Sequence, residues 1–167
     1  MRVGADVERM KKTIALLAAA VLVVAAGAVS ARADGDPVAA AKADVQQLVT
    51  DATALHSTVV ADAQKITADA QSLQGTTDVE AARETLKADV QKLRADRQQL
   101  VPPVLADWKQ LRTDLEAVRA AHAGTADLRS TLEQARETLR QEREDVRTAL
   151  EAARQAMRAL RQSLASK

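Results

Sequence analysis

Cysteine, tyrosine and phenylalanine are absent from this chain of 167 residues, and Trp108 is its single tryptophan. Without cysteine the fold has no disulfide, no reactive thiol and no lipid-anchor cysteine. The shortage of aromatic residues also removes the side chains that favour strands and those that stack on nucleic acid bases. Alanine, glutamine, arginine, glutamate and leucine dominate instead, and all are good helix formers. The composition predicts an all-α protein held by packing alone, with no nucleic acid partner.

Motifs for reaction chemistry are also missing. No glycine-rich phosphate loop or nucleophile elbow occurs, and His56 and His122 belong to no metal-binding pair such as H-x-x-x-H. Carboxylates are plentiful, but acid–base catalysis needs a shaped and partly dry pocket, which long alanine-rich helices do not provide. We therefore predict no catalytic residue, no cofactor, no metal site and no small-molecule substrate, and we do not expect an enzyme.

Charge is absent from residues 13–31, and this run is flanked as in a signal peptide. Lys11 and Lys12 precede it, and Ala31 and Ala33 form an A-x-A site before Asp34. A basic start, an apolar stretch and small residues at the cut are typical of a secretory signal. We predict that residues 1–33 are removed after Ala33, and that the protein reaches a bacterial periplasm or the cell exterior.

Two alternatives accompany the predicted signal. Met10 is a better start than Met1, because signal peptides usually have a short basic region before the apolar one. Residues 13–31 could also remain as an anchor, since 19 residues at about 1.5 Å each nearly cross a hydrocarbon core of about 30 Å. Removal of residues 1–33 takes away five basic and two acidic side chains, which leaves 19 basic and 21 acidic ones in residues 34–167. The length of residues 34–167 is that of one domain.

Glycine and proline divide residues 34–167 into three helical stretches. Gly75 and Gly124 mark two turns, which predicts helices over about 38–74, 78–122 and 126–165. Equal lengths and short turns favour an elongated, antiparallel, up-down-up three-helix bundle. The apolar residues of the first and third stretches repeat every seven positions, as in a coiled coil: Val38, Val45, Ala52, Val59, Ile66 and Leu73, then Leu132, Leu139, Val146, Ala153 and Leu160.

Pro102 and Pro103 interrupt the second helix. Leu100, Val104 and Trp108 keep helical spacing across the two prolines, so we expect a kink rather than a chain reversal. A tight turn at residues 75–77 would place Ile66 level with Leu86. We further predict that Trp108 is a core residue packed near the small side chain of Ala41; the alternative is that Trp108 is a binding handle.

An arginine stripe follows the third helix at steps of 4, 3, 4, 7, 4 and 3. One interpretation is an anion-binding face. The other is internal pairing: an expected offset of about 96 between the first and third helices would join Asp44 to Arg140, Asp51 to Arg147 and Asp62 to Arg158, and we favour it. Exposed ion pairs contribute only about 0–1 kcal/mol each, so such pairs would set register more than stability. The stripe consists of Arg136, Arg140, Arg143, Arg147, Arg154, Arg158 and Arg161.

These features together predict an exported helical interaction protein of the bacterial envelope. It would be a structural component or a chaperone-like binder of other proteins. The alternative is a peripheral protein that binds an anionic membrane or envelope polymer through the arginine stripe. The apolar residues that repeat every seven positions can be buried within one chain or between two chains, so the sequence leaves self-association open.

Overall fold

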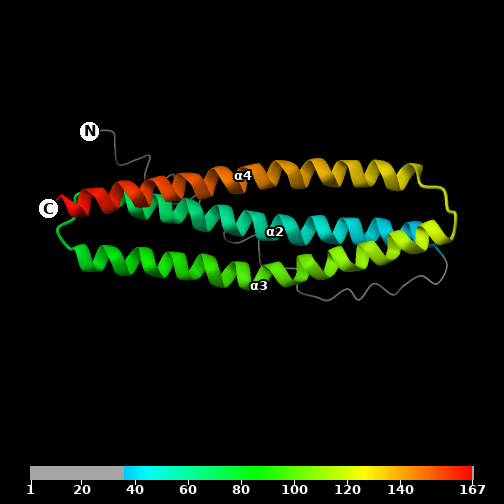
Figure 1. The fold of residues 1–167 in the computed structure, drawn as a ribbon, viewed down its shortest axis with the longest axis horizontal. Coiled ribbons are helices and arrows are strands. Elements are labelled where there is room, and N and C mark those ends of the chain that lie inside the picture. Colours follow the sequence, from blue (N-terminus) through cyan, green and yellow to red (C-terminus); the bar gives the residue numbers. More distant parts are fainter. Residues whose placement is uncertain (1–35, 167) are drawn as a thin grey trace, which may run out of the picture. The chain divides into compact units, whose positions relative to one another are not determined.

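Three long helices make up residues 36–166, the part of the chain that the computed structural model describes: α2 (Pro37–Ser72), α3 (Val79–Ala120) and α4 (Ala126–Ala165). No strand occurs among these residues. The helices lie side by side and alternate in direction (Figure 1). The all-helical bundle is confirmed, and its helix boundaries differ from the predicted ones by at most two residues. The predicted signal peptide, with its cleavage site at Ala31, Ala33 and Asp34, lies outside the described residues.

Acidic side chains begin the first two helices. Oδ1 of Asp36 accepts hydrogen bonds from the N–H groups of Val38 and Ala39, at 2.9 and 3.2 Å. Oδ1 of Asp78 accepts one from the N–H of Ala81 at 3.0 Å. Each carboxylate satisfies N–H groups that have no partner inside the helix, and its charge favours the positive end of the helix dipole.

The two turns reach their geometry by different residues. Gly75 in the first turn has a left-handed φ of +91°, as predicted for a glycine at a helix end. In the second turn the left-handed residue is His122, with a φ of +49°. The N–H of His122 bonds to the Arg119 carbonyl and the N–H of Ala123 to the Val118 carbonyl, which is the Schellman pattern. α3 therefore ends at Ala120, and the left-handed residue that closes it is His122 and not Gly124.

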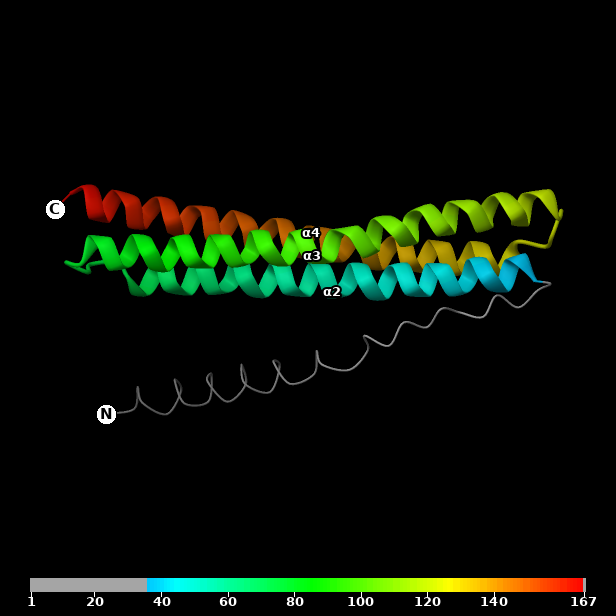
Figure 2. The same cartoon turned by 90° about the horizontal axis from the view of Figure 1, so that it is seen from below.

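α2 is the central helix of the bundle. It packs along both other helices, whereas α3 and α4 approach each other at few points, and Figure 2 shows α2 running beside both. Alanines at buried positions allow this close approach to two neighbours. The buried apolar residues of α2 are Ala41, Val45, Leu48, Ala52, Val59, Ala63, Ile66 and Ala70.

Helix α3 continues through Pro102 and Pro103. Each proline lacks an N–H and crowds the preceding turn, so the carbonyls of Gln98 and Gln99 lose their usual helical donors. In Figure 2 the path of α3 changes direction near its middle. The prolines bend a continuous helix and do not reverse the chain.

The levels of the helices differ from the predicted ones. Ile66 packs with Val90 and Leu93, about one turn beyond the expected Leu86, because residues 73–78 stay outside the helices and widen the first turn. His56 bonds to Glu142, 86 positions later, instead of the predicted offset of about 96. Small errors in two turns add up, so the predicted α2–α4 offset was wrong by almost three helical turns.

A search of the described residues for a helix long and apolar enough to cross a membrane finds none.

Candidate protein-binding groove

The side of the bundle between α3 and α4, where these two helices do not close upon each other, has two hollows that we together call the groove. One stretch of it is lined by α3 alone, from Leu105 to Arg119. The other is lined by residues 82–94 of α3 and 157–165 of α4. Leu111 and Leu160 border these stretches from the core and are 2% and 1% exposed. The groove exists because both flanking helices pack on α2 and only weakly on each other.

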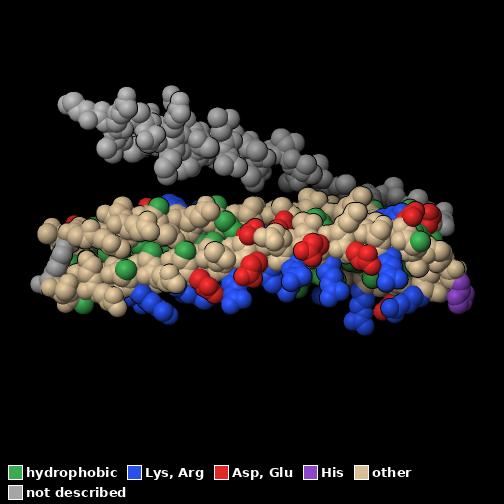
Figure 3. Space-filling model, turned by 90° about the horizontal axis from the view of Figure 1, so that it is seen from above, with side chains coloured by type: hydrophobic (Ala, Val, Ile, Leu, Met, Phe, Trp, Pro, Cys, Tyr) green, Lys and Arg blue, Asp and Glu red, His purple; other side chains and the backbone are tan. Residues whose placement is uncertain are grey.

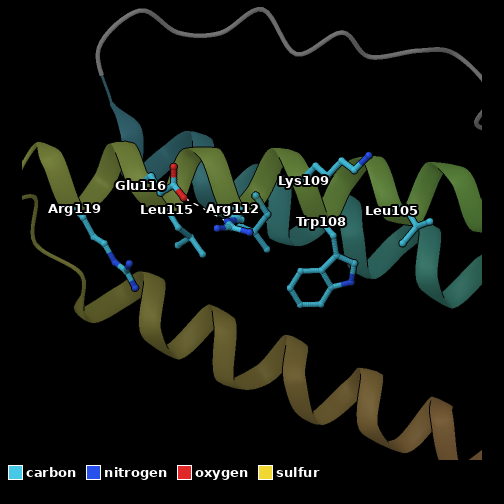
Figure 4. A pocket seen from close by; sticks show the side chains of 8 residues that line it. Leu105, Trp108, Lys109, Arg112, Leu115, Glu116 and Arg119 are labelled. Carbon is cyan, nitrogen blue, oxygen red and sulfur yellow. Dashed lines mark hydrogen bonds and ion pairs between the residues drawn. The ribbon is translucent and has the colours of Figure 1, made fainter.

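Leu105 and Trp108 are the exposed large apolar side chains of this groove, at 54% and 52%. Both project from α3 toward α4 without reaching it (Figure 4). The prediction of Trp108 as a core residue near Ala41 is therefore wrong. Leu111 and Val118 occupy the positions of α3 that face α2, and the helical rotation between Trp108 and Leu111 leaves the indole at the edge of that face.

One face of α3 alternates basic and apolar residues along the groove. Its ten members follow steps of 4, 3, 4, 7, 4, 3, 4, 3 and 4, which keeps them on one side of the helix. Five are basic, five are apolar and none is acidic. This face was not predicted from the sequence, because only the core-facing side of α3 was recognised there. The helical spacing of its basic residues is nevertheless visible in the sequence. The face consists of Arg83, Lys87, Val90, Arg94, Val101, Leu105, Trp108, Arg112, Leu115 and Arg119.

The arginine stripe of α4 borders the same groove. Arg161 lines it beside Met157 and Leu164, and the regular steps of the stripe carry its other members along the same side of α4. In Figure 3 the lysine and arginine side chains gather along one long edge of the bundle, with acidic side chains among them. The groove is thus flanked by basic side chains from both helices.

The predicted pairing of this stripe with α2 is wrong. Arg140 lies 3.8 Å from Glu137, and Nε of Arg147 lies 3.1 Å from Glu151, so both bind acids of their own helix. Asp62 accepts a hydrogen bond from Lys92 of α3 at 2.7 Å, not from Arg158. The offset of 96 was the source of the error, because the true offset turns different residues of α4 toward α2. The stripe is exposed, as Arg140 and Arg147 show at 81% and 69%.

Lysines neutralise buried aspartates in the part of the α2–α3 interface near the first turn. Lys92 of α3 bonds to Asp62 and Asp96, and Lys65 of α2 bonds to Asp69 and Asp89. The side chains of Asp62 and Asp89 are only 8% exposed. Hydrogen bonds from the lysines lower the pKa of Asp69 and of Asp96, whereas burial outweighs Lys92 and raises the pKa of Asp62.

Beyond the prolines the same interface contains aspartates without a lysine. Burial, and then a hydrogen bond and repulsion from Asp51 of α2, raise the pKa of Asp107 to about 6. Oδ2 of Asp107 is buried without a hydrogen-bond partner, and the same holds for Oδ2 of Asp62 and of Asp89 near the first turn. Asp114, one helical repeat further along α3, is 9% exposed and accepts a hydrogen bond from Gln110 at 3.1 Å. This part of the interface has acids where the other part has ion pairs.

The remaining polar contacts position helices. His56 of α2 lies 2.8 Å from Glu142 of α4, and Thr53 donates to the same carboxylate at 2.6 Å. His122 lies at the end of α3, away from His56. Within residues 36–166 no group of three His, Cys, Asp or Glu side chains could hold a metal ion.

The chain matches no family model, no curated protein and no solved structure.

Proposed function

We propose that this chain is an exported helical interaction protein of the bacterial envelope that binds other proteins through the groove between α3 and α4. The observation that carries the proposal is the exposure of Leu105 and Trp108, more than half of each, inside an apolar groove. Exposed apolar patches with a polar rim are typical of protein interaction sites. Tryptophan and arginine are the residues most enriched at the energetic centres of interfaces.

Export is supported by the sequence of the N-terminal region. The uncharged run of residues 13–31, the preceding Lys11 and Lys12, and the A-x-A site before Asp34 are together the pattern of a secretory signal. In the envelope the protein acts as a structural or chaperone-like binder, because its groove offers exposed apolar side chains to a partner. Intact-mass measurement of the exported protein tests the cleavage, with a chain that begins at Asp34 as the expected product.

The test of groove binding is a comparison of crosslinked partners. The double variant Leu105→Ser and Trp108→Ser removes the apolar anchors, and Gln64→Ser with Ala68→Ser places two serines on the cleft between α2 and α4 as a control for position. After crosslinking in the intact envelope, the groove variant loses the partners that the control variant retains. Equal recovery of the same partners by both variants contradicts groove binding.

The arginine stripe supports a second candidate, binding to an anionic membrane or envelope polymer. No acid follows Glu151 in α4, so Arg154, Arg158 and Arg161 form a basic end. If this candidate is correct, the protein sediments with anionic vesicles, and binding weakens as salt rises because exposed charges are screened over about 8–10 Å. Retention on anionic vesicles by the Leu105→Ser and Trp108→Ser variant would separate this activity from groove binding.

A further inference from the structure

We propose that the occupant of the groove is an amphipathic helix of a partner protein, with an apolar stripe flanked by acidic residues. Docking of this helix completes a four-helix bundle. The inference rests on the proposed protein-binding function and specifies the chemistry of the partner.

Charge is the first argument. Seven basic side chains line the two stretches of the groove, and a single acid, Glu116, lies among them. Glu116 is bonded to Arg112 at 3.4 Å, so this pair has no net charge, and the seven basic side chains less one acid leave a surplus of six positive charges. Complementary charge steers association and excludes partners of like charge. The seven are Arg83, Lys87, Arg94, Lys109, Arg112, Arg119 and Arg161.

Shape is the second argument. A helix with its side chains is about 10–12 Å across, and helices commonly lay an apolar face into a groove between two others. A partner helix along α3 would cover Leu105, Trp108 and the half-buried Leu115.

A second copy of this chain is a poor occupant. Placing one groove on another would bring Arg94, Arg112 and Arg119 of one copy against the basic groove face of the other. Like charges brought together at an interface cost several kcal/mol. The groove therefore discriminates against itself and in favour of an acidic helix.

Two synthetic helices test the inference. Each is a peptide of about 20 residues, about 30 Å long as a helix, with the same leucine stripe and no tryptophan. One has glutamate on both flanks and the other has lysine. Trp108 is the single tryptophan of the protein, so its fluorescence reports occupation of the groove. The glutamate peptide should shift Trp108 emission to shorter wavelength and bind at least about tenfold more tightly than the lysine peptide, and the difference should shrink as salt rises.

A charge-reversed protein provides the second arm. Arg94→Glu with Arg119→Glu removes two positive charges and adds two negative ones on the groove. The control carries Gln46→Glu, Gln47→Glu, Gln64→Glu and Gln71→Glu, which gives the same change in net charge at exposed positions of α2. The groove variant should lose its preference for the glutamate peptide, while the control keeps it. Helicity of both variants is compared with the wild type, so that loss of fold is recognised.

Each outcome has one meaning. If both peptides shift Trp108 equally, the groove binds helices and the acidic partner is wrong, while the proposed function stands. If neither peptide shifts Trp108, the inference is wrong, and the crosslinking comparison decides separately on groove binding. If anionic vesicles shift Trp108 and the glutamate peptide does not, the surface binds lipid and the inference is likewise overturned.

Discussion

The two parts of the α2–α3 interface differ in how the negative charge of their aspartates is compensated. Near the first turn, Asp62 and Asp89 are buried and each is bonded to a lysine of the facing helix. Beyond Pro102 and Pro103, the half-buried Asp107 lies beside Asp51 and pairs with no lysine. A buried carboxylate with a cation fixes which residues face each other. One without a cation weakens the contact at neutral pH, because burial and repulsion both act against its charge.

The part of the interface without lysines is also the part that presents Leu105 and Trp108, the exposed apolar side chains of the groove. Leu105, Trp108 and Leu115 belong to the stretch of α3 after the prolines, on the same segment as Asp107 and Asp114. The paired half sets the register of the bundle, and the acidic half leaves this segment less firmly held against α2. A binding surface placed there can adjust to a partner at low cost in free energy.

Removal of both lysines should have the largest effect, because it makes the paired half resemble the acidic one. Lys65→Ala with Lys92→Ala leaves Asp62 and Asp89 buried without cations. Breaking a buried pair costs about 3–5 kcal/mol, but the lysines are 53% and 55% exposed. We therefore expect a loss of about 2 kcal/mol for each, measured by urea unfolding. The exposed Lys87→Ala is the control and should change stability by about 0–1 kcal/mol; a similar loss in the control would remove the distinction.

Replacement of the prolines should make α3 a regular helix across the boundary between the two parts of the interface. Pro102→Ala with Pro103→Ala restores the N–H donors to the carbonyls of Gln98 and Gln99 and removes the crowding of the preceding turn. Proline in a helix interior costs about 3 kcal/mol relative to alanine, and the bend has already relieved part of this cost. We expect unfolding by urea to require about 2 kcal/mol more, with higher helicity by circular dichroism. A lower melting temperature would contradict a continuous α3.

The acidic half should give the protein a pH dependence that Asp107→Asn removes. The pKa of Asp107 is about 6 in the folded protein, whereas its ordinary value, which holds in the unfolded chain, is 3.8. Between these pH values the folded state holds the proton more often than the unfolded chain, so the free energy of unfolding rises as pH falls. After allowance for screening by water we expect about 1–2 kcal/mol between pH 7 and pH 4.

Acid titration of the wild type and the Asp107→Asn variant isolates this effect, since the difference between the two curves should vanish near pH 4 and grow toward pH 7. Below pH 4 the sign changes for both proteins. The pKa values of Asp69 and Asp96 are lowered by the lysines, so their contribution is lost as these carboxylates become protonated. If the free energies of unfolding of the two proteins change in parallel from pH 7 to pH 4, the pKa of Asp107 is not raised in the folded protein.

The smallest effect is expected from the arginine stripe. Arg140→Ala, Arg147→Ala and Arg158→Ala together should change the free energy of unfolding by less than about 1 kcal/mol, because the ion pairs of Arg140 and Arg147 lie within α4 and are exposed. Further changes of Asp44, Asp51 and Asp62 to lysine should not compensate a triple change of these arginines to glutamate. Such compensation would restore the internal pairing that the fold contradicts.

Periodicity and turn residues were sufficient to predict the helices, because apolar spacing and isolated glycines act over short distances. The rotation of each helix about its axis and its position along its neighbours were harder to predict. Trp108 kept helical phase with Leu100 and Val104, yet a bend and a shift of one turn carried it to the edge of the α2-facing side. Ion pairs between helices depend on both turns at once, so Lys92 and not Arg158 faces Asp62. The groove arises from the absence of α3–α4 packing, which no local pattern reports.

Fluorescence of Trp108 in the isolated protein tests the central claim, that the groove between α3 and α4 is open. At low protein concentration we expect emission at the wavelength of a free tryptophan derivative and efficient quenching by a neutral quencher such as acrylamide. The emission should not change when the protein is concentrated. Emission at short wavelength with protection from the quencher would place Trp108 in a closed core, and protection that appears only on concentration would show that a second copy covers the groove.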